Sequence, residues 1–281
     1  MVRPSVFREG LLRGKTAIIT GGASGIGLGI SHRLAQAGAN IVIASRRKDL
    51  CDTVAEDIAS LHGVKTLALP LNVRDSAQVN AAFAEAREQM GSLDILVNNA
   101  AGNFYYPART MSDNQWRAVL EIDLFGTFYC CRAACEHMKD HGGSIVSISM
   151  TLHHHGWVGM APATAAKAGI DALTQTLALE WSPYGIRVNA IAPGPIITEG
   201  VTEAFKLGGD FANFKEAIPL GRAGQPEEIG NMVVFLSSEA GAWMTGSIVV
   251  MDGGERLSAT RAGIAPGAIE GLAAMIKAGK Q

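Results

Sequence analysis

Short apolar runs alternate along the chain with longer stretches in which apolar residues recur at helical spacing. The runs predict strands at residues 16–20, 41–45, 66–71, 95–98, 144–149, 187–191 and 247–251. Apolar residues fill consecutive positions in these runs, as in strands that helices cover on both faces. The alternation therefore predicts an α/β fold, a single doubly wound Rossmann-type domain with a seven-stranded parallel sheet.

The regular alternation assigns residues 1–254 to one domain, and two irregular segments depart from it. Residues 195–225 mix proline, glycine and phenylalanine before a helix that is expected to start at Pro226. Long insertions of this kind are typical of binding loops, so we expect a substrate loop there. Residues 255–281 form a C-terminal tail that we expect to pack on the domain or on a neighbouring subunit.

Composition and charge narrow the kinds of partner. The chain has 48% apolar and 18% charged residues and a net charge of −2, which gives no long-range attraction to nucleic acid or to anionic membranes. No segment approaches the roughly 20 apolar residues that span a bilayer. The first residues lack a secretory signal, and the last four, Ala-Gly-Lys-Gln, do not match the peroxisomal Ser-Lys-Leu signal. We therefore expect a cytoplasmic protein with a small-molecule partner.

Neither the cysteines nor the histidines have the spacing of a metal site. The four cysteines are too few and too clustered for a disulfide framework, and we expect buried thiols at Cys51, Cys130, Cys131 and Cys135. Residues 153–155 are three successive histidines, which cannot all face one ion, and no acidic or cysteine partner follows at ligand spacing. We expect no bound metal, and one of these histidines is a candidate proton donor.

A glycine-rich segment, Thr-Gly-Gly-Ala-Ser-Gly-Ile-Gly at residues 20–27, joins the first predicted strand to the first helix. A tight turn alone would also use glycines. At this place in the alternating pattern, however, the free N–H groups at the start of the helix are suited to hold a pyrophosphate. The predicted contacts to a dinucleotide are Gly21, Ser24, Gly25, Ile26 and Gly27.

The end of the second strand predicts which nicotinamide cofactor binds. About 20 residues past the glycines an NAD enzyme offers Asp or Glu to the ribose hydroxyls, whereas this chain has Ser45, Arg46 and Arg47. These groups are suited to a 2′-phosphate, which predicts NADPH, and the alternative is a solvated cluster at the start of the next helix. Asn72 and Val73, after the third strand, are expected near the adenine.

Four further motifs accompany the glycine turn: Asn-Asn-Ala-Ala-Gly at residues 98–102, Lys167, Arg-Val-Asn at 187–189 and Pro-Gly-Pro-Ile at 193–196. Over residues 12–254 this combination resembles the short-chain dehydrogenase/reductase family. The resemblance implies that the nicotinamide half of the cofactor contacts residues that follow the fourth and sixth strands and one residue on the helix before the sixth strand. These residues are Asn99, Ala100, Ala101, Gly102, Lys167, Pro193, Gly194 and Ile196.

Within that family the chain is most similar to the 2,4-dienoyl-CoA reductases, on Ala-Ala-Gly-Asn-Phe at residues 100–104 and Ile-Ala-Ser-Arg at 43–46. The family usually has a catalytic Tyr four residues before the Lys and a Ser thirteen residues before the Tyr. These positions are Ala163 and Met150 here, and neither side chain transfers a proton. Asp123 stands where family members generally carry Asn. The combination resembles the peroxisomal branch of dienoyl-CoA reductases.

The mitochondrial branch of those reductases has a Tyr and a Ser at positions that are Leu152 and Ala163 here, so the resemblance leaves the oxyanion donor unidentified. The missing phenol also bears on the chemistry. Ketone reduction needs a proton on oxygen, and losing the phenol impairs it. Hydride addition to a conjugated thioester spreads negative charge onto the thioester oxygen, and a carbon is protonated later by a group such as water.

The sequence therefore predicts an NADPH-dependent reductase that converts a 2,4-dienoyl-CoA to an enoyl-CoA through a dienolate. Two alternatives remain: a short-chain reductase of a 3-oxoacyl thioester or cyclic ketone, and a catalytically lapsed NADPH-binding protein. The predicted catalytic residues are Lys167, whose charge favours the developing enolate, and Asp123, which orients Lys167 or a water molecule. Either residue could instead have a structural role.

Several residues near these motifs are candidates for contacts with an acyl-CoA. The predicted substrate residues are Asn103, Phe104, Thr151 and Trp157, with Tyr105 and Tyr106 as further pocket candidates, although turn hydrogen bonding or packing explains them equally well. Lys206 and Arg222 are candidates for the CoA phosphates. By resemblance, the predicted helices at residues 113–139 and 162–181 pair across two-fold axes in a homotetramer, or their apolar faces simply pack on the sheet.

Overall fold

All seven predicted strands are present in the computed structural model, which describes residues 6–151, 156–198 and 218–257. The strands are β1 (Thr16–Thr20), β2 (Asn40–Ser45), β3 (Thr66–Pro70), β4 (Ile95–Asn98), β5 (Gly143–Ile148), β6 (Ile186–Pro193) and β7 (Ile248–Met251). Every pair is parallel, and the order across the sheet is β3-β2-β1-β4-β5-β6-β7. The predicted α/β fold with a seven-stranded parallel sheet is confirmed.

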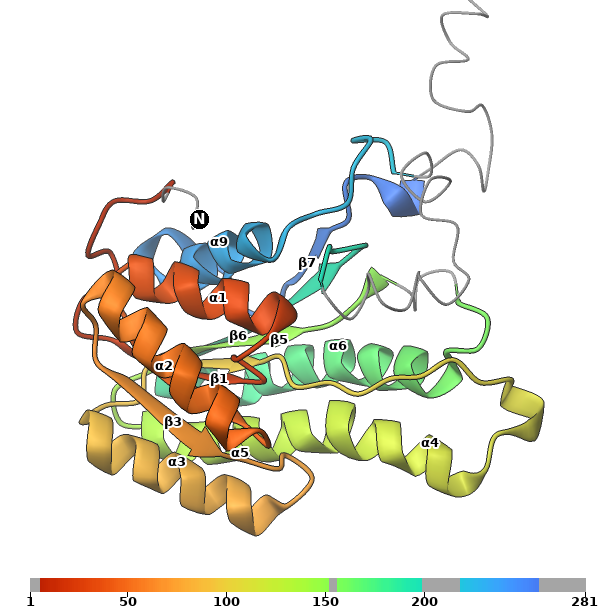
Figure 1. Cartoon of the computed structure of the whole chain (residues 1–281), viewed down its shortest axis with the longest axis horizontal. Helices are drawn as coiled ribbons and strands as arrows, with labels where there is room; N and C mark the ends of the chain where they lie inside the picture. Colours follow the sequence, from red (N-terminus) through yellow and green to blue (C-terminus); the bar gives the residue numbers. More distant parts are fainter. Residues whose placement is uncertain (1–5, 152–155, 199–217, 258–281) are drawn as a thin grey trace, which may run out of the picture.

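Helices cover both faces of the sheet (Figure 1). One face carries α1 (Gly25–Gln36), α2 (Lys48–His62) and α9 (Pro226–Ser237). The other face carries α3 (Ser76–Met90), α5 (Gly126–Met138) and α6 (Ala161–Trp181). The sheet is therefore the middle of three layers.

Each face of the sheet has its own apolar core. Ile19 of β1 packs in the core under α1 and α9, whereas its neighbour Ile18 packs in the core on the side of α3 and α5. Successive side chains of a strand point to opposite faces, so both must be apolar when both faces are covered. This explains the unbroken apolar runs in the sequence.

The segment predicted as one helix over residues 113–139 consists of α4 (Asp113–Leu120), a π-helical turn η2 (Glu121–Phe125) and α5. The prediction of a continuous α-helix is wrong at this turn. The turn was not recognisable in the sequence, because a single wider turn hardly changes the spacing of apolar residues. The Thr127 hydroxyl donates to the carbonyl oxygen of Asp123 at 2.6 Å. Single π turns are frequent at functional sites, and Asp123 lies in this one.

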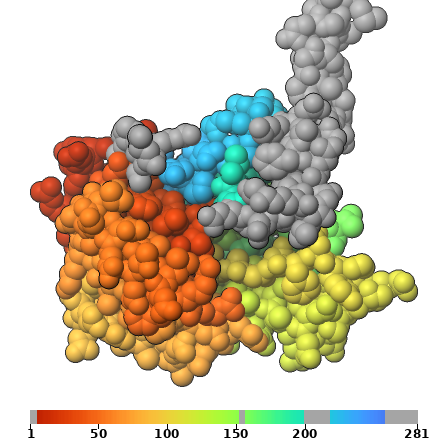
Figure 2. All heavy atoms as spheres, in the orientation of Figure 1, coloured from red at the N-terminus to blue at the C-terminus, as the bar shows by residue number. Residues whose placement is uncertain are grey.

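The strand order reverses beside β1, which pairs with β2 on one side and with β4 on the other. Ligands of doubly wound sheets bind outside the carboxyl ends of the strands at this point. The red and orange amino-terminal segments and the yellow and green middle segments occupy opposite sides of the face seen in Figure 2. The fold therefore directs the search for a site to the carboxyl ends of β1 and β4.

Some predicted features lie outside the described residues, namely the histidines at 153–155, Lys206, and the tail from residue 258. Of the expected substrate loop, residues 195–198 and 218–225 are described. Within the described ranges, no helix is long and apolar enough to cross a bilayer. The cysteines are buried thiols, as predicted, and burial raises the pKa of Cys131 to about 12.

Candidate active site

A cavity of about 410 Å³ lies at the carboxyl ends of β1, β2 and β4, where the strand order reverses. Its walls come from the glycine turn and from the segments that follow β2, β3 and β4. Eleven of the predicted cofactor contacts line it: Gly21, Ser24, Gly25, Ile26, Ser45, Arg46, Asn72, Val73, Asn99, Ala100 and Ala101. The structure thus brings together most of the residues that the motifs predicted to hold a dinucleotide.

The glycine turn is held by Asn99, which follows β4. The Asn99 side-chain amide donates to the carbonyl oxygens of Thr20 and Gly21, each at 3.1 Å. Gly21 has a φ of +66°, and a Cβ on Gly27 would collide with the Gly21 carbonyl oxygen and lie 2.5 Å from the Asn99 Nδ2. The sequence predicted a cofactor contact at Asn99, but this tether between the turn and β4 was not predicted.

The start of α1 is suited to an anion. Ser24 is the N-cap residue of α1, yet its side chain makes no capping hydrogen bond to the helix. Its Oγ instead accepts from the Arg47 Nη2 at 3.1 Å. The exposed guanidinium of Arg46 has no hydrogen-bond or ion-pair partner among the residues that the structure describes. The cavity therefore offers uncapped backbone N–H groups and a cationic mouth, which fits a dinucleotide with an additional phosphate.

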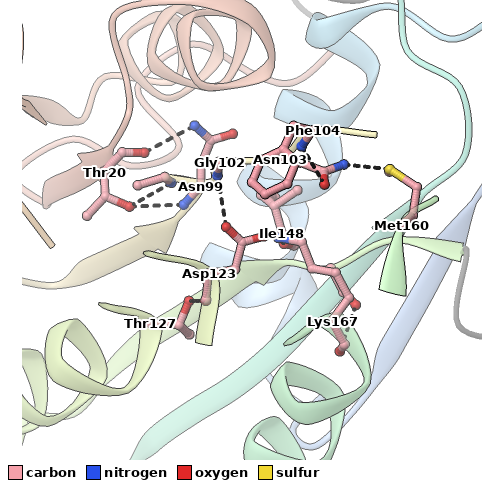
Figure 3. Close-up of polar contacts among 12 residues, drawn as sticks. Thr20, Asn99, Gly102, Asn103, Phe104, Asp123, Thr127, Ile148, Met160 and Lys167 are labelled. Carbon is pink, nitrogen blue, oxygen red and sulfur yellow. Dashed lines mark hydrogen bonds and ion pairs between the residues drawn. The ribbon is translucent and has the colours of Figure 1, made fainter. Parts of the chain in front are cut away.

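Asp123 and Lys167 form a buried ion pair next to this cavity. The Asp123 Oδ2 lies 3.6 Å from the Lys167 Nζ, and the side chains are 1% and 7% exposed. The other carboxylate oxygen, Oδ1, accepts from the Gly102 N–H at 2.8 Å (Figure 3). The Lys167 Nζ also donates to the Ile148 carbonyl oxygen at 2.9 Å. This burial excludes a solvated carboxylate and a surface lysine, and Asp123 joins the loop after β4 to the lysine of α6.

An apolar cluster lies beside Lys167. Ala163, one helical turn before Lys167 in α6, is buried with Val119 of α4 and Met160. Three partly buried side chains pack against them: Phe104, Met150 and Trp157. Two of the predicted substrate residues, Phe104 and Trp157, are therefore in one cluster with the residues at the positions where the family has Tyr and Ser. A grouping of this kind is suited to a hydrocarbon chain.

Asn103 and Thr151, the other predicted substrate residues, make different contacts. The Asn103 side-chain amide donates to the sulfur of Met160 at 2.8 Å, and its Oδ1 accepts from the Phe104 N–H (Figure 3). Thr151 is buried, and its hydroxyl donates to the Pro193 carbonyl oxygen at 3.4 Å. A thioether is a weak acceptor, so the Asn103 amide retains donor capacity for a ligand.

Other predicted residues do not line the cavity. Pro193 ends β6, the Gly194 N–H donates to the Met251 carbonyl oxygen, and Ile196 forms a bridge with Gly224. None of the residues 193–196 is among those described residues that line the cavity. The guanidinium of Arg222 is paired with Glu228, at 2.7 Å from Nη2 to Oε1, so it is engaged within the chain.

Comparison with known proteins agrees with this geometry. Residues 21–255 match the family described as Enoyl-(Acyl carrier protein) reductase. The chain is 43% identical over 258 residues to “Peroxisomal 2,4-dienoyl-CoA reductase [(3E)-enoyl-CoA-producing]” of Danio rerio, covering 90% of this chain and 85% of that protein. It is 39% identical over 248 residues to “Probable 2,4-dienoyl-CoA reductase [(2E)-enoyl-CoA-producing]” of Bacillus subtilis (strain 168), covering 87% and 97%.

Solved structures of similar sequence have the same fold. A short-chain type dehydrogenase/reductase from Mycobacterium marinum superposes with a TM-score of 0.82 at 33% identity, covering 87% of this chain and 96% of that one. A short chain dehydrogenase from Bacillus anthracis superposes with a TM-score of 0.78 at 40% identity, covering 86% and 96%. With the glycine turn, the parallel sheet and these matches together, the chain belongs to the short-chain dehydrogenase/reductase family of oxidoreductases.

Proposed function

We propose that the protein reduces a 2,4-dienoyl-CoA to an enoyl-CoA with NADPH. The observation that carries this proposal is the buried Asp123–Lys167 pair beside an apolar cluster that has Ala163 where the family places its catalytic phenol. The pair supplies a positive charge, and the cluster supplies a wall for an acyl chain. The names of the zebrafish and Bacillus relatives support the same substrate class.

The cavity residues favour NADPH over NADH. Arg46 presents at the cavity a guanidinium that has no partner among the described residues, and no acid stands at the end of β2 to bind ribose hydroxyls. The uncapped start of α1 holds the pyrophosphate, and Asn72 and Val73 border the adenine. NADPH, when bound, supplies the hydride.

Two groups stabilise the negative charge that develops on the thioester oxygen. The Lys167 ammonium, held by Asp123 and the Ile148 carbonyl, lies in a water-poor interior where its charge acts strongly. Asn103 is the oxyanion donor that this proposal adds, because its amide has only the thioether of Met160 as an acceptor among the described residues. Turning that amide from sulfur to the thioester oxygen gains a stronger hydrogen bond.

Proton delivery does not depend on a side chain at position 163. The dienolate takes its proton on carbon, and water is a sufficient donor for that step. Asp123 positions Lys167 and the Gly102 amide, so it acts through these groups. A ketone substrate needs a proton on oxygen in the same step, and Ala163 offers none. This distinction favours the dienoyl substrate over a 3-oxoacyl thioester or cyclic ketone.

The test is the loss of NADPH absorbance with a panel of dienoyl, enoyl and 3-oxoacyl thioesters and cyclic ketones. We expect turnover with 2,4-dienoyl-CoA, and mass spectrometry and NMR of the product locate the remaining double bond. Faster turnover of a ketone or 3-oxoacyl thioester would establish the rival reductase. NADPH binding without turnover of any substrate would establish a lapsed enzyme.

Cofactor choice has its own test. Arg46→Ala is expected to raise the KM for NADPH about 10- to 100-fold, since hydrogen bonds to a charged group contribute about 1.5–3 kcal/mol, and to leave the KM for NADH unchanged. Arg47→Ala is the matched control, because that guanidinium is bound to Ser24, and we expect a smaller effect. An unchanged preference in Arg46→Ala would contradict the assignment of NADPH.

We also infer a homotetramer. Phe125 of η2 and Phe128 of α5 are 46% and 36% exposed, and exposed aromatic side chains on neighbouring helical turns are typical of a surface that another subunit covers. Sedimentation of the full chain tests this, with Phe125→Ser/Phe128→Ser as the variant expected to fall to a smaller species. A wild-type mass equal to the single chain of 29.5 kDa would contradict it.

Location in the cell stays a prediction. One of the two relatives described above is named as peroxisomal and the other is not. The expected cytoplasmic location is tested by imaging the full chain with a fluorescent tag beside a peroxisomal marker.

A further inference from the structure

His32 and His62 are in contact on the face of the sheet that α1 and α2 cover. His32 lies in α1 and His62 is the last residue of α2, and the two helices are neighbours (Figure 1). The His32 Nδ1 is 3.2 Å from the His62 Nε2, and the ring planes are inclined by 68°. Both residues are half-buried, so each ring has a restricted set of orientations.

This spacing matches that of two nitrogen ligands on one metal ion. Zinc–nitrogen bonds of about 2.0–2.1 Å at a tetrahedral angle place the two nitrogens about 3.4 Å apart. In the structure the two nitrogens share a hydrogen bond. One of the two nitrogens carries the hydrogen of that bond, so both become ligands only when this hydrogen moves to the other nitrogen of its ring and the rings turn toward a common point.

One member of the pair, His62, lines a groove of about 650 Å³ that is separate from the cofactor cavity. Asn40, which begins β2, and Lys65, which precedes β3, also line it, so it lies at the amino ends of the strands. The cofactor cavity is at the carboxyl ends, which makes the pair independent of the proposed reaction.

We propose that His32 and His62 bind one divalent transition-metal ion, of the class of Zn²⁺, Ni²⁺ or Cu²⁺, with water as the remaining ligands. Imidazole prefers these ions to Mg²⁺. Within the described ranges no group of three or more His, Cys, Asp or Glu side chains is arranged to hold a metal, so the site has two protein ligands. The hydrogen between the rings moves by exchange with water to the outer nitrogen of its ring, and no net proton is released. The bound ion joins α1 to α2.

Titration calorimetry with NiCl2 and ZnCl2 tests the proposal. Because residues 153–155 also offer imidazoles, the titrations use a full-length variant in which these three histidines are changed to Gln. We expect one saturable site per chain, and a melting temperature that rises with metal concentration, since only the folded state places the two rings together. MgCl2 at the same concentrations is expected to have no effect.

Adding His32→Gln or His62→Gln to that background is expected to abolish the site and the rise in melting temperature. Circular dichroism verifies that each variant is folded, and the position of His62 at the end of α2 makes His62→Gln the milder of the two. A site that survives both substitutions, or no saturable site before they are made, overturns the proposal and leaves the contact as an imidazole–imidazole hydrogen bond.

Discussion

The Asp123 carboxylate lies 3.6 Å from the Lys167 ammonium, and neither side chain has appreciable contact with solvent. Removing one member of such a pair leaves the other charge buried without a partner, which typically costs about 3–5 kcal/mol. Removing both leaves no unpaired charge. The pair therefore allows its contribution to stability to be separated from its contribution to catalysis.

Lys167→Met is expected to destabilise the fold by about 3–5 kcal/mol and to abolish turnover, because Asp123 is left unpaired and the charge beside the substrate is lost. Asp123→Asn also removes the counter-charge of Lys167, but the Gly102 N–H keeps an acceptor and the Lys167 ammonium keeps the Ile148 carbonyl, so we expect a smaller loss of stability and a lower kcat. The double variant is expected to recover stability relative to Lys167→Met but no activity. Urea denaturation and steady-state kinetics measure both quantities. Purely additive losses of stability would show that the two side chains do not act as a pair.

The fold was predictable from the sequence because its strands are buried on both faces. The run at residues 95–98 is apolar until Asn98, and it coincides with β4. The predicted strand at residues 187–191 is shorter than the observed strand β6 at both ends. The ends of β6, Ile186 and Pro193, lie where the apolar pattern meets turn residues. Local pattern therefore located each strand and left its exact ends to tertiary contacts.

The candidate site was predictable only in part. Gly21, Gly25 and Arg46 are recognised by residue type and spacing, and they line the cavity as expected, whereas Gly27 does not line it. The tether from Asn99 to the glycine turn joins positions 79 and 78 residues apart, and no local pattern reports such a contact. The π turn that holds Asp123 is likewise set by tertiary contacts, namely its packing against α6, the Gly102 N–H and Lys167.

Gly27→Ala is expected to weaken NADPH binding at least about 10-fold and to destabilise the fold by about 1–3 kcal/mol, the usual range for overpacking. The new methyl group would collide with the carbonyl oxygen of Gly21 and displace the turn that receives the pyrophosphate. Fluorescence titration with NADPH and urea denaturation measure the two effects.

The matched control is Gly63→Ala, at the end of α2. Gly63 has a φ of +64° and open space around its Cα, so the substitution strains the backbone by about 1 kcal/mol away from the cavity. We expect NADPH binding to be unchanged in this variant. Equal weakening in both variants would trace the effect to general loss of stability rather than to the turn.

Asp94, before β4, ties that strand to the start of β1. Its carboxylate accepts from the Thr16 N–H at 2.9 Å and from the Ser92 hydroxyl at 2.7 Å, and it pairs with Lys15 at 3.1 Å. Asp94→Ala is expected to lower the free energy of unfolding by about 2–3 kcal/mol, because the buried Thr16 N–H loses its acceptor. Lys15→Ala is expected to change it by less than about 1 kcal/mol, since the Lys15 side chain is 55% exposed. Similar losses in the two variants would contradict this division.

Stability is expected to fall as the pH decreases from about 7.5 to 5.5. Burial lowers the pKa values of His32, His62 and His137 in the folded state, and nearby cationic side chains act in the same direction. The unfolded chain therefore binds more protons than the folded one as the pH falls below the ordinary histidine pKa of about 6.5. Each histidine that stays neutral contributes up to about 1.4 kcal/mol per pH unit. The contribution is fully present above pH 6.5 and declines below it. Burial acts to raise the pKa of Asp94, but its hydrogen bonds and Lys15 lower it, so its contribution is lost only below about pH 4.

The measurement is urea denaturation with EDTA at several pH values, which removes any effect of bound metal. His32→Gln is expected to reduce the dependence on pH between 7.5 and 5.5, because one half-buried imidazole is removed and His62 loses its partner. At pH 8, where these histidines are neutral in both states, the difference between variant and wild type reflects packing and the lost hydrogen bond alone. If the free energy of unfolding of the variant changes with pH as that of the wild type does over the whole range, the His32–His62 pair binds protons equally well in the folded and unfolded states.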